Sequence, residues 1–104
     1  VKKAVQYIVE NACDEQLTLS SVLKHVNMSR ATFSRHFQSA LGQSFTHFLQ
    51  SIRLEAARNQ LTSTDKSITE IAYESGFSNL SHFNSLFKKR WDMTPRDLRM
   101  MTKK

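Results

Sequence analysis

The stretch Ser67–Trp91, SITEIAYESGFSNLSHFNSLFKKRW, decides the fold of this chain. On either side of Gly76 its apolar residues recur three or four positions apart, which is the spacing of one face of an α-helix. These residues are Ile68, Ile71 and Ala72 before the glycine and Phe83, Leu86 and Phe87 after it. Gly76 can take the positive φ that a tight turn needs. The stretch therefore predicts two short helices joined by a turn.

The second of these helices has a polar outward face and ends in a basic run. Ser78 or Asn79 can cap its N-terminus by accepting a hydrogen bond from a free backbone N–H group. The outward positions are Ser81, Asn84, Ser85 and Lys88, and Lys89 and Arg90 complete the basic run. A short helix, a tight turn and a second helix with a hydrogen-bonding face form a helix-turn-helix. The second helix of such a motif enters the major groove of DNA.

Composition favours one helical domain with a polyanionic partner. The 104 residues include only two glycines and one proline, and we expect an all-α fold, built as two small lobes. Fifteen Lys and Arg residues against nine Asp and Glu residues give a formal charge of +6. No acidic residue occurs from Gln16 to Leu54 or from Ser75 to Trp91. These two basic spans suit nucleic-acid binding.

The first part of the chain also reads as three helices. Helical stripes predict a helix over residues 1–13 and another from Leu19 to Val26, after which Asn27 can form a turn. Ser29 is a good N-cap for a third helix, and Gly42 closes it. The first helix has the stripe Ala4, Val5, Ile8, Val9 and Ala12, and the third has the buried face Phe33, Phe37, Ala40 and Leu41.

The span Leu19–Leu41 repeats the organisation of Ser67–Trp91. Val22 falls on Ile71 at an offset of 49 positions. After one extra residue in the second turn, Phe33 falls on Phe83 at an offset of 50 positions. The outward positions Ala31, Ser34, Arg35 and Gln38 fall on Ser81, Asn84, Ser85 and Lys88. Core positions keep their character and outward positions do not, as expected of an internal repeat whose copies face different targets.

A long helix over Phe45–Leu61 joins the two copies. One apolar stripe begins at Phe45 and a second, about 140° around the axis at 100° per residue, ends at Leu61. This helix suits a linker between two lobes, and we predict a first lobe over 1–43, a linker over 44–62 and a second lobe over 63–104. Residues 62–65 are expected to form a loop. A final helix begins at the Thr94–Pro95 pair and packs through Leu98 and Met101, giving about seven helices in all.

Several functional classes lack support in the sequence. The four histidines, His25, His36, His47 and His82, do not have metal-ligand spacing, and no nucleophile or phosphate-loop motif occurs, so we expect neither an enzyme nor a cofactor. Cys13 is interpreted as a structural thiol. Without a membrane-length apolar segment or a visible signal peptide, we expect a cytoplasmic protein. The chain begins Val-Lys-Lys, and we expect it to be a fragment of a longer protein.

These motifs resemble the C-terminal DNA-binding domain of the AraC/XylS family of bacterial transcription regulators. The second copy matches through Ile68, Ile71, Ala72, Gly76, Phe77, Ser81, Phe83, Phe87, Lys88, Thr94, Pro95 and Arg99. The first copy matches through Leu17, Thr18, Leu19, Val22, Val26, Met28, Ser29, Arg35, Phe37, Gly42, Arg53, Leu54 and Ala57. The resemblance implies regulation of transcription, RNA polymerase as a partner, and an N-terminal sensing or dimerisation domain in the full-length protein.

Four positions depart from the family pattern. Leu23 stands where the family prefers a small Ala, and Asn27 stands where it prefers Gly. Phe45 replaces a frequent Pro, and Asp92 replaces the Gly that commonly precedes the Thr-Pro pair. These departures concern local packing and turn geometry.

In the first copy, Arg35 is the strongest candidate for reading a base. Its guanidinium can bind guanine O6 and N7 together, which discriminates by ~1–3 kcal/mol against a wrong base. The alternative is an arginine that is solvated or bound to phosphate. Ser34 can offer a hydroxyl group, and Ala31 can contact a thymine methyl group. Arg30 and Gln38 are expected to contact the DNA backbone.

In the second copy, Asn84 can pair with adenine N6 and N7, and Ser81 and Ser85 can bind bases or phosphates. Leu80 lies at a family contact position, although it can equally be a core residue beside Phe83. His82 is either a phosphate contact or a partly buried structural residue. Lys88 and Lys89 are expected to bind phosphate, which sets affinity and salt dependence without reading sequence.

Three other kinds of binding protein fit parts of the pattern. A non-specific architectural DNA binder fits the charge, but the two polar faces differ in chemistry. A helical protein-interaction module would need apolar outward faces. A single-strand RNA binder would need exposed aromatic residues, whereas the Phe residues lie on buried stripes. We therefore predict sequence-specific binding of double-stranded DNA.

Overall fold

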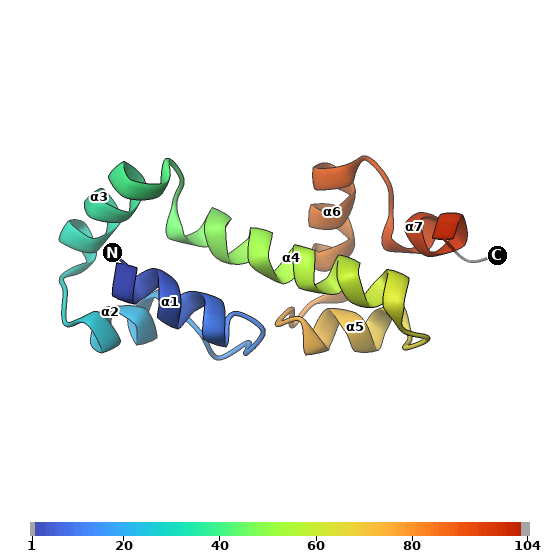
Figure 1. Ribbon diagram of the computed structural model, residues 1–104, viewed down its shortest axis with the longest axis horizontal. Coiled ribbons are helices and arrows are strands. Elements are labelled where there is room, and N and C mark those ends of the chain that lie inside the picture. The colour runs from blue at the N-terminus through green and yellow to red at the C-terminus, as the bar shows by residue number, and fades with distance from the viewer. Residues whose placement is uncertain (1, 103–104) are drawn as a thin grey trace.

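The computed structural model describes residues 2–102, which form seven α-helices and no β-strand (Figure 1). The helices are α1 (Lys2–Asn11), α2 (Leu19–Val26), α3 (Arg30–Leu41), α4 (Phe45–Ser63), α5 (Ile68–Glu74), α6 (Leu80–Trp91) and α7 (Pro95–Thr102). The domain is elongated, with extents of 48 × 22 × 21 Å, and α4 runs along its long axis (Figure 1). The predicted all-α fold, with two helix-turn-helix units joined by a long helix, is confirmed.

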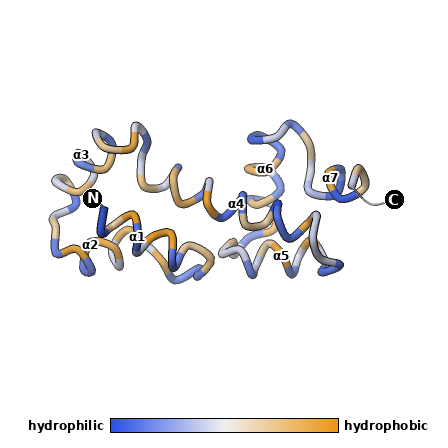
Figure 2. Tube along the Cα trace, viewed as in Figure 1, coloured by the Kyte–Doolittle hydropathy of each residue, from blue (hydrophilic) through white to orange (hydrophobic). Residues whose placement is uncertain are grey.

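Two separate hydrophobic clusters hold the domain together. The first joins α1, α2, α3 and the start of α4 around Ile8, Val22, Phe33, Phe37 and Leu49. The second joins the end of α4 to α5, α6 and α7, and its buried members include Ala57, Leu61, Ile71, Phe83, Phe87 and Leu98. Hydrophobic and hydrophilic residues alternate along most turns (Figure 2), as expected of helices that bury one side and expose another.

Helix α4 contributes to both clusters from different sides. Leu49 belongs to the first cluster, whereas Leu54, Ala57 and Leu61 belong to the second. At 100° per residue, Leu54 lies about 140° around the helix from Leu49. The two predicted apolar stripes therefore correspond to the two clusters.

Local capping explains where the helices begin and end. The side chains of Ser29, Ser44, Ser67 and Asn79 accept hydrogen bonds at the N-termini of α3, α4, α5 and α6, so Asn79 rather than Ser78 caps α6. Left-handed backbone follows α2 at Asn27 (φ 54°), α3 at Gly42 (φ 70°) and α6 at Asp92 (φ 58°), and Gly76 (φ 104°) lies in the turn after α5. These residues end each helix because they tolerate positive φ.

A few local expectations were wrong. Helix α4 extends to Ser63, past the expected loop start at residue 62, because the Ser63 hydroxyl bonds back to the Asn59 carbonyl at 2.7 Å. Met101 is 69% exposed because α7 packs through Pro95 and Leu98 in its first turns. Ala40 and Val9 were expected to pack and are both exposed, and Cys13, interpreted as a structural thiol, is exposed too. Ala40 is too short to reach the cluster that Leu41 contacts, Val9 lies at the edge of the α1 stripe, and Cys13 lies in the turn after α1.

Candidate nucleic-acid interface

Helices α3 and α6 occupy the same side of the molecule. In Figure 1 both rise above α4, whereas α1, α2 and α5 lie below it. Each is fixed by two phenylalanines four residues apart that are at most 1% exposed, Phe33 and Phe37 in α3 and Phe83 and Phe87 in α6. Burying an aromatic side chain stabilises by roughly 1.5–3 kcal/mol, so each helix has a strong anchor on one face and a free face opposite.

The free face of α3 carries the residues that the sequence singled out. Ala31, Ser34 and Arg35 are exposed, as are the two expected backbone contacts Arg30 and Gln38. Within residues 2–102, the Arg35 side chain makes no hydrogen bond or ion pair with the protein, so all of its donors are available to a ligand. The structure therefore brings these five residues to one exposed helix.

Helix α6 presents a different set of groups. Ser81 and Ser85 are exposed, and Asn84, which shares their face, is half-buried. Leu80 is half-buried and packs against the second cluster, so it has a core role whatever else it contacts. His82 is exposed, which argues against the structural role that the sequence left open. Lys88 and Lys89 are exposed near the C-terminus of α6.

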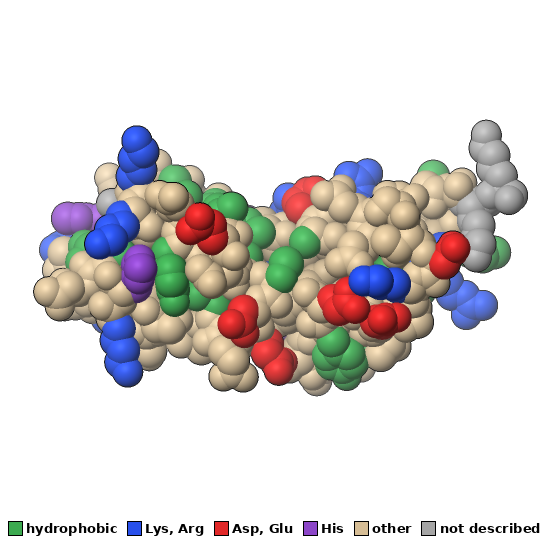
Figure 3. Space-filling view, turned by 60° about the horizontal axis from the view of Figure 1, so that its bottom comes forward, with side chains coloured by type: hydrophobic (Ala, Val, Ile, Leu, Met, Phe, Trp, Pro, Cys, Tyr) green, Lys and Arg blue, Asp and Glu red, His purple; other side chains and the backbone are tan. Residues whose placement is uncertain are grey.

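Basic charge is concentrated on α3 and α6. Neither helix contains an acidic residue, and α6 ends in Lys88, Lys89 and Arg90. Figure 3 turns the lower side of Figure 1 forward, and there acidic side chains are spread from the middle of the molecule towards its C-terminal end, with Lys and Arg side chains on the same face. Among the acidic residues, Glu10 is on α1 and Glu70 and Glu74 are on α5. A polyanion is therefore attracted to the side of α3 and α6.

Arg53 of α4 fastens the first lobe to the second, a role that the sequence analysis missed. Its Nε donates to the Ala12 carbonyl at 2.6 Å and its guanidinium donates to the Asp14 carbonyl at 2.9 Å. Burial lowers the pKa of Arg53, and the nearby Asp14 carboxylate opposes that effect. Arg53 also lies directly against Gly76 in the turn of the second unit. The signal in the sequence that could have indicated this role is an arginine between two apolar residues, Ile52 and Leu54, in the linker helix.

Arg99 does the equivalent work at the other end of α4. It donates to the carbonyls of Leu61 at 3.3 Å and Thr64 at 3.1 Å, and also to the carbonyl of Lys66. These carbonyls lie at the C-terminal end of α4 and in the loop after it, where helix carbonyls lack intrahelical partners. These contacts dock α7 on the linker helix and satisfy acceptors that are partly exposed.

Other kinds of site have no geometric support in the part of the chain that the structure describes. Over residues 2–102 no group of three or more His, Cys, Asp or Glu side chains could hold a metal ion. In the same range, no helix has the length and apolar character that crossing a bilayer requires. The exposed faces of α3 and α6 are therefore the main candidate surface.

Known proteins share this architecture. A family profile described as "Helix-turn-helix domain" matches residues 22–101. An uncharacterised HTH-type transcriptional regulator of Staphylococcus aureus (strain MSSA476) is 38% identical over 98 residues, which cover 88% of this chain and 13% of that protein. The chain thus spans a small part of the length of this relative.

Two solved structures superpose closely on the whole domain. The C-terminal domain of AraT, a response regulator from Geobacillus stearothermophilus, has a TM-score of 0.91 and 37% identity, covering 96% of this chain and 83% of that one. The DNA-binding domain of AdpA, solved in complex with a target DNA, has a TM-score of 0.90 and 25% identity, covering 96% and 89%. With two helix-turn-helix units, a shared linker helix and these matches, the chain belongs to the AraC/XylS family of helix-turn-helix DNA-binding domains.

Proposed function

We propose that this domain binds double-stranded DNA sequence-specifically, with α3 and α6 in two adjacent major grooves, and so regulates transcription. The observation that carries the proposal is that two helices with unlike polar faces lie on the same side of α4 in a molecule 48 Å long. Successive major grooves on one side of B-DNA are ~34 Å apart, a distance that this length can span. The likeness to the AdpA domain, which was solved in complex with a target DNA, supports DNA binding by this domain.

Base reading in the first groove falls to α3. Arg35 donates two hydrogen bonds to guanine O6 and N7, Ser34 adds a hydroxyl contact, and Ala31 packs on a thymine methyl group. The exposure of all three residues and the absence of competing protein partners for Arg35 among residues 2–102 support these roles. Arg30 and Gln38 bind the adjacent phosphates and fix the register of α3.

Base reading in the second groove falls to α6. Asn84 pairs with adenine N6 and N7, and Ser81 and Ser85 bind neighbouring base edges. Leu80 offers an apolar contact at the start of α6, limited to the part of its side chain that the core leaves exposed. His82, Lys88 and Lys89 bind phosphates. The two helices thus favour different half-sites.

The proposal also covers the full-length protein to which this domain belongs. We expect this domain to act in the cytoplasm beside an N-terminal sensing or dimerisation domain, and to place that protein near RNA polymerase. Its role is binding rather than catalysis. If the lobes hold α3 and α6 closer together than ~34 Å, the bound DNA bends at a cost of order 1–6 kcal/mol.

Selection of bound duplexes from a random pool, at a fixed and stated salt concentration, tests the function. We expect a bipartite consensus with two half-sites about one helical turn apart. On that duplex, Arg35→Ala costs ~1–3 kcal/mol and relaxes the preference at one base pair in one half-site. Lys88→Ala weakens all sequences about equally and lowers the salt slope by ~1.

The paired variants also separate the proposal from a non-specific architectural binder. Such a protein would yield no consensus, and Arg35→Ala would then resemble Lys88→Ala in every duplex. An unchanged base preference in Arg35→Ala would remove the central assignment even if a consensus emerged.

A further inference from the structure

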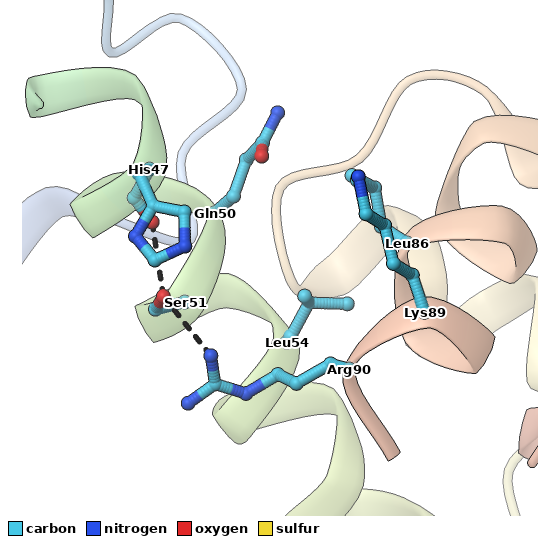
Figure 4. A pocket seen from close by; sticks show the side chains of 7 residues that line it. All are labelled: His47, Gln50, Ser51, Leu54, Leu86, Lys89 and Arg90. Carbon is cyan, nitrogen blue, oxygen red and sulfur yellow. Dashed lines mark hydrogen bonds between the residues drawn. The ribbon is translucent and has the colours of Figure 1, made fainter. Parts of the chain in front are cut away.

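A pocket lies between the linker helix α4 and helix α6, and none of the residues assigned above to base reading lines it. It has a volume of about 340 Å³. Leu54 and Leu86 supply apolar walls, and five polar side chains complete the lining (Figure 4). His47, Gln50 and Ser51 come from α4, and Lys89 and Arg90 come from α6. No acidic residue lines this pocket.

A second pocket continues it along α4. That pocket has a volume of about 380 Å³ and shares His47, Ser51 and Arg90 with the first. Its lining adds Glu55, the only carboxylate in either pocket. The two pockets form one groove across the middle of the domain, between the lobe of α3 and the lobe of α6.

Arg90 is held at the boundary between the two pockets. One guanidinium nitrogen donates to the Ser51 hydroxyl at 3.2 Å and another to a Glu55 oxygen at 3.3 Å. The Ser51 hydroxyl in turn donates to the His47 carbonyl at 2.9 Å, and the guanidinium lies 5.2 Å from the Trp91 ring centroid. The Arg90 and Glu55 side chains are 35% and 47% exposed, so their ion pair is weak. A phosphate can replace Glu55 without moving the arginine far.

The groove borders the proposed DNA surface. Lys89 follows Lys88 and lies four residues after Ser85, so Ser85 and Lys89 are neighbours on α6. A duplex that meets both α3 and α6 passes the groove midway, where the backbone crosses from one major groove to the next. Two cations, Lys89 and Arg90, and the side-chain amide of Gln50 line one small pocket and match the charge and acceptors of a phosphodiester.

We propose that this groove, the α4–α6 seat, binds one backbone phosphate of the DNA between the two half-sites, with Arg90 exchanging Glu55 for that phosphate. The inference rests on the proposed function and adds a third, central contact to it. Because its donors come from both the linker helix and α6, the seat responds to the position of the DNA backbone between the half-sites and not to the identity of the bases there. It therefore favours duplexes in which the shape of the spacer between the half-sites brings that phosphate close to α4.

Two substitutions of opposite expected effect test the seat in the selected duplex. Gln50→Glu places a carboxylate in the pocket and weakens binding, whereas Glu55→Gln frees Arg90 and tightens binding about two- to fivefold. Gln6→Glu, on the exposed surface of α1, is the matched control because it changes the net charge equally. We expect Gln50→Glu to weaken binding several-fold more than Gln6→Glu, with the same half-site consensus.

Neutral methylphosphonate substitutions, one at a time along the spacer of the duplex, locate the contact. We expect the substitution at one central phosphate to weaken binding by the wild-type domain and to have little further effect on the Arg90→Gln variant. The slope of log K against log salt concentration should also be smaller for Arg90→Gln by about 0.9. Circular dichroism confirms that each variant is folded. Chemical shifts of the Gln50 side-chain amide, followed with inorganic phosphate in the absence of DNA, test for a free-phosphate site.

The results separate the two proposals. If the wild-type domain selects no sequence, the proposed function fails. If it selects a sequence but Gln50→Glu matches Gln6→Glu, or no central phosphate couples to Arg90, the seat alone is refuted. Saturable binding of inorganic phosphate with no methylphosphonate effect would likewise overturn the DNA assignment.

Discussion

Replacing Gly76 with alanine tests whether the close contact of Gly76 with Arg53 and Ala12 stabilises the packing of the two lobes against each other. A Cβ atom at this position would lie 2.6 Å from Arg53 Nε and 3.0 Å from both the Arg53 Cδ atom and the Ala12 carbonyl oxygen. The 2.6 Å distance is shorter than real Cβ contacts allow, and the two 3.0 Å distances are tighter than most of them. The φ of +104° is also unfavourable for any residue with a side chain. Alanine must therefore displace Arg53 from the Ala12 carbonyl, to which it donates at 2.6 Å.

The expected cost has two parts. Positive φ costs an alanine roughly 1–2 kcal/mol. Weakening one hydrogen bond from a charged donor costs about 1.5–3 kcal/mol, and we take the lower end because Arg53 is half-buried and water can partly replace the acceptor. The sum is about 3 kcal/mol in the free energy of unfolding. For a domain of this size, that lowers Tm by at least about 10 °C.

Gly42→Ala is the matched control. Gly42 also has a positive φ, +70°, but a Cβ there would meet no heavy atom within 4 Å. Its cost should be the backbone part alone, roughly 1–2 kcal/mol. Urea denaturation followed by circular dichroism at 222 nm measures both variants, because the fold is helical.

A double-mutant cycle isolates the contact with Arg53. In an Arg53→Ala background, Gly76→Ala should cost little more than Gly42→Ala, because only the Ala12 carbonyl remains close. The reasoning is refuted if Gly76→Ala costs no more than Gly42→Ala, or if its cost is the same with and without Arg53.

Three smaller predictions use the same unfolding assay. Asp92→Gly should stabilise the domain by about 1 kcal/mol, because it relieves a positive φ of 58° and removes a negative charge at the C-terminus of α6. Asn27→Gly, at φ 54°, should change the free energy of unfolding by no more than about 0.5 kcal/mol, and equal effects of the two variants would contradict the charge argument. Ser75→Ala should leave stability unchanged or raise it by about 1 kcal/mol, because the Ser75 hydroxyl is fully buried and unpaired within residues 2–102; a clear loss would reveal a partner. Hydrogen bonding with Thr94, above all from its backbone N–H group to the Asp97 carboxylate, lowers the pKa of Asp97 below its usual value of 3.8. The stability advantage of the wild type over Asp97→Asn should therefore be full above about pH 4 and disappear as pH falls through the lowered pKa, and a constant difference would contradict the cap.

Local features of the fold were predictable from the sequence because their causes are local. The Phe33–Phe37 and Phe83–Phe87 pairs set the buried faces of α3 and α6 through helical periodicity alone. The N-cap at Ser29 and the positive φ of Gly76 likewise follow from single residue types. The exposure of Arg35 opposite such a buried pair follows from the same periodicity, although its base contact stays a prediction.

Long-range polar contacts could not be predicted in the same way. Arg53 and Arg99 bond mainly to backbone carbonyls that lie 33 to 41 positions away. Every residue has a carbonyl group, so such an acceptor leaves no mark on the sequence. The sequence indicated only that Arg90 belongs to the basic run at the end of its helix, and its bond to Ser51 across the middle of the domain depends on how α6 packs on α4.

The four positive-φ residues show how the repeat separates backbone geometry from residue identity. Asn27 and Gly76 are 49 positions apart and Gly42 and Asp92 are 50 positions apart, so they occupy equivalent turns in the two copies. Each copy has one glycine and one residue with a side chain, in opposite order. Positive φ alone is therefore compatible with Asn or Asp, which tolerate the left-handed region. Of the two glycines, only Gly76 has no room for a Cβ, because Arg53 and Ala12 approach it where the lobes meet. The requirement for glycine at residue 76 thus comes from the contact between the lobes together with a φ of +104°, well beyond the values that Asn27 and Asp92 adopt.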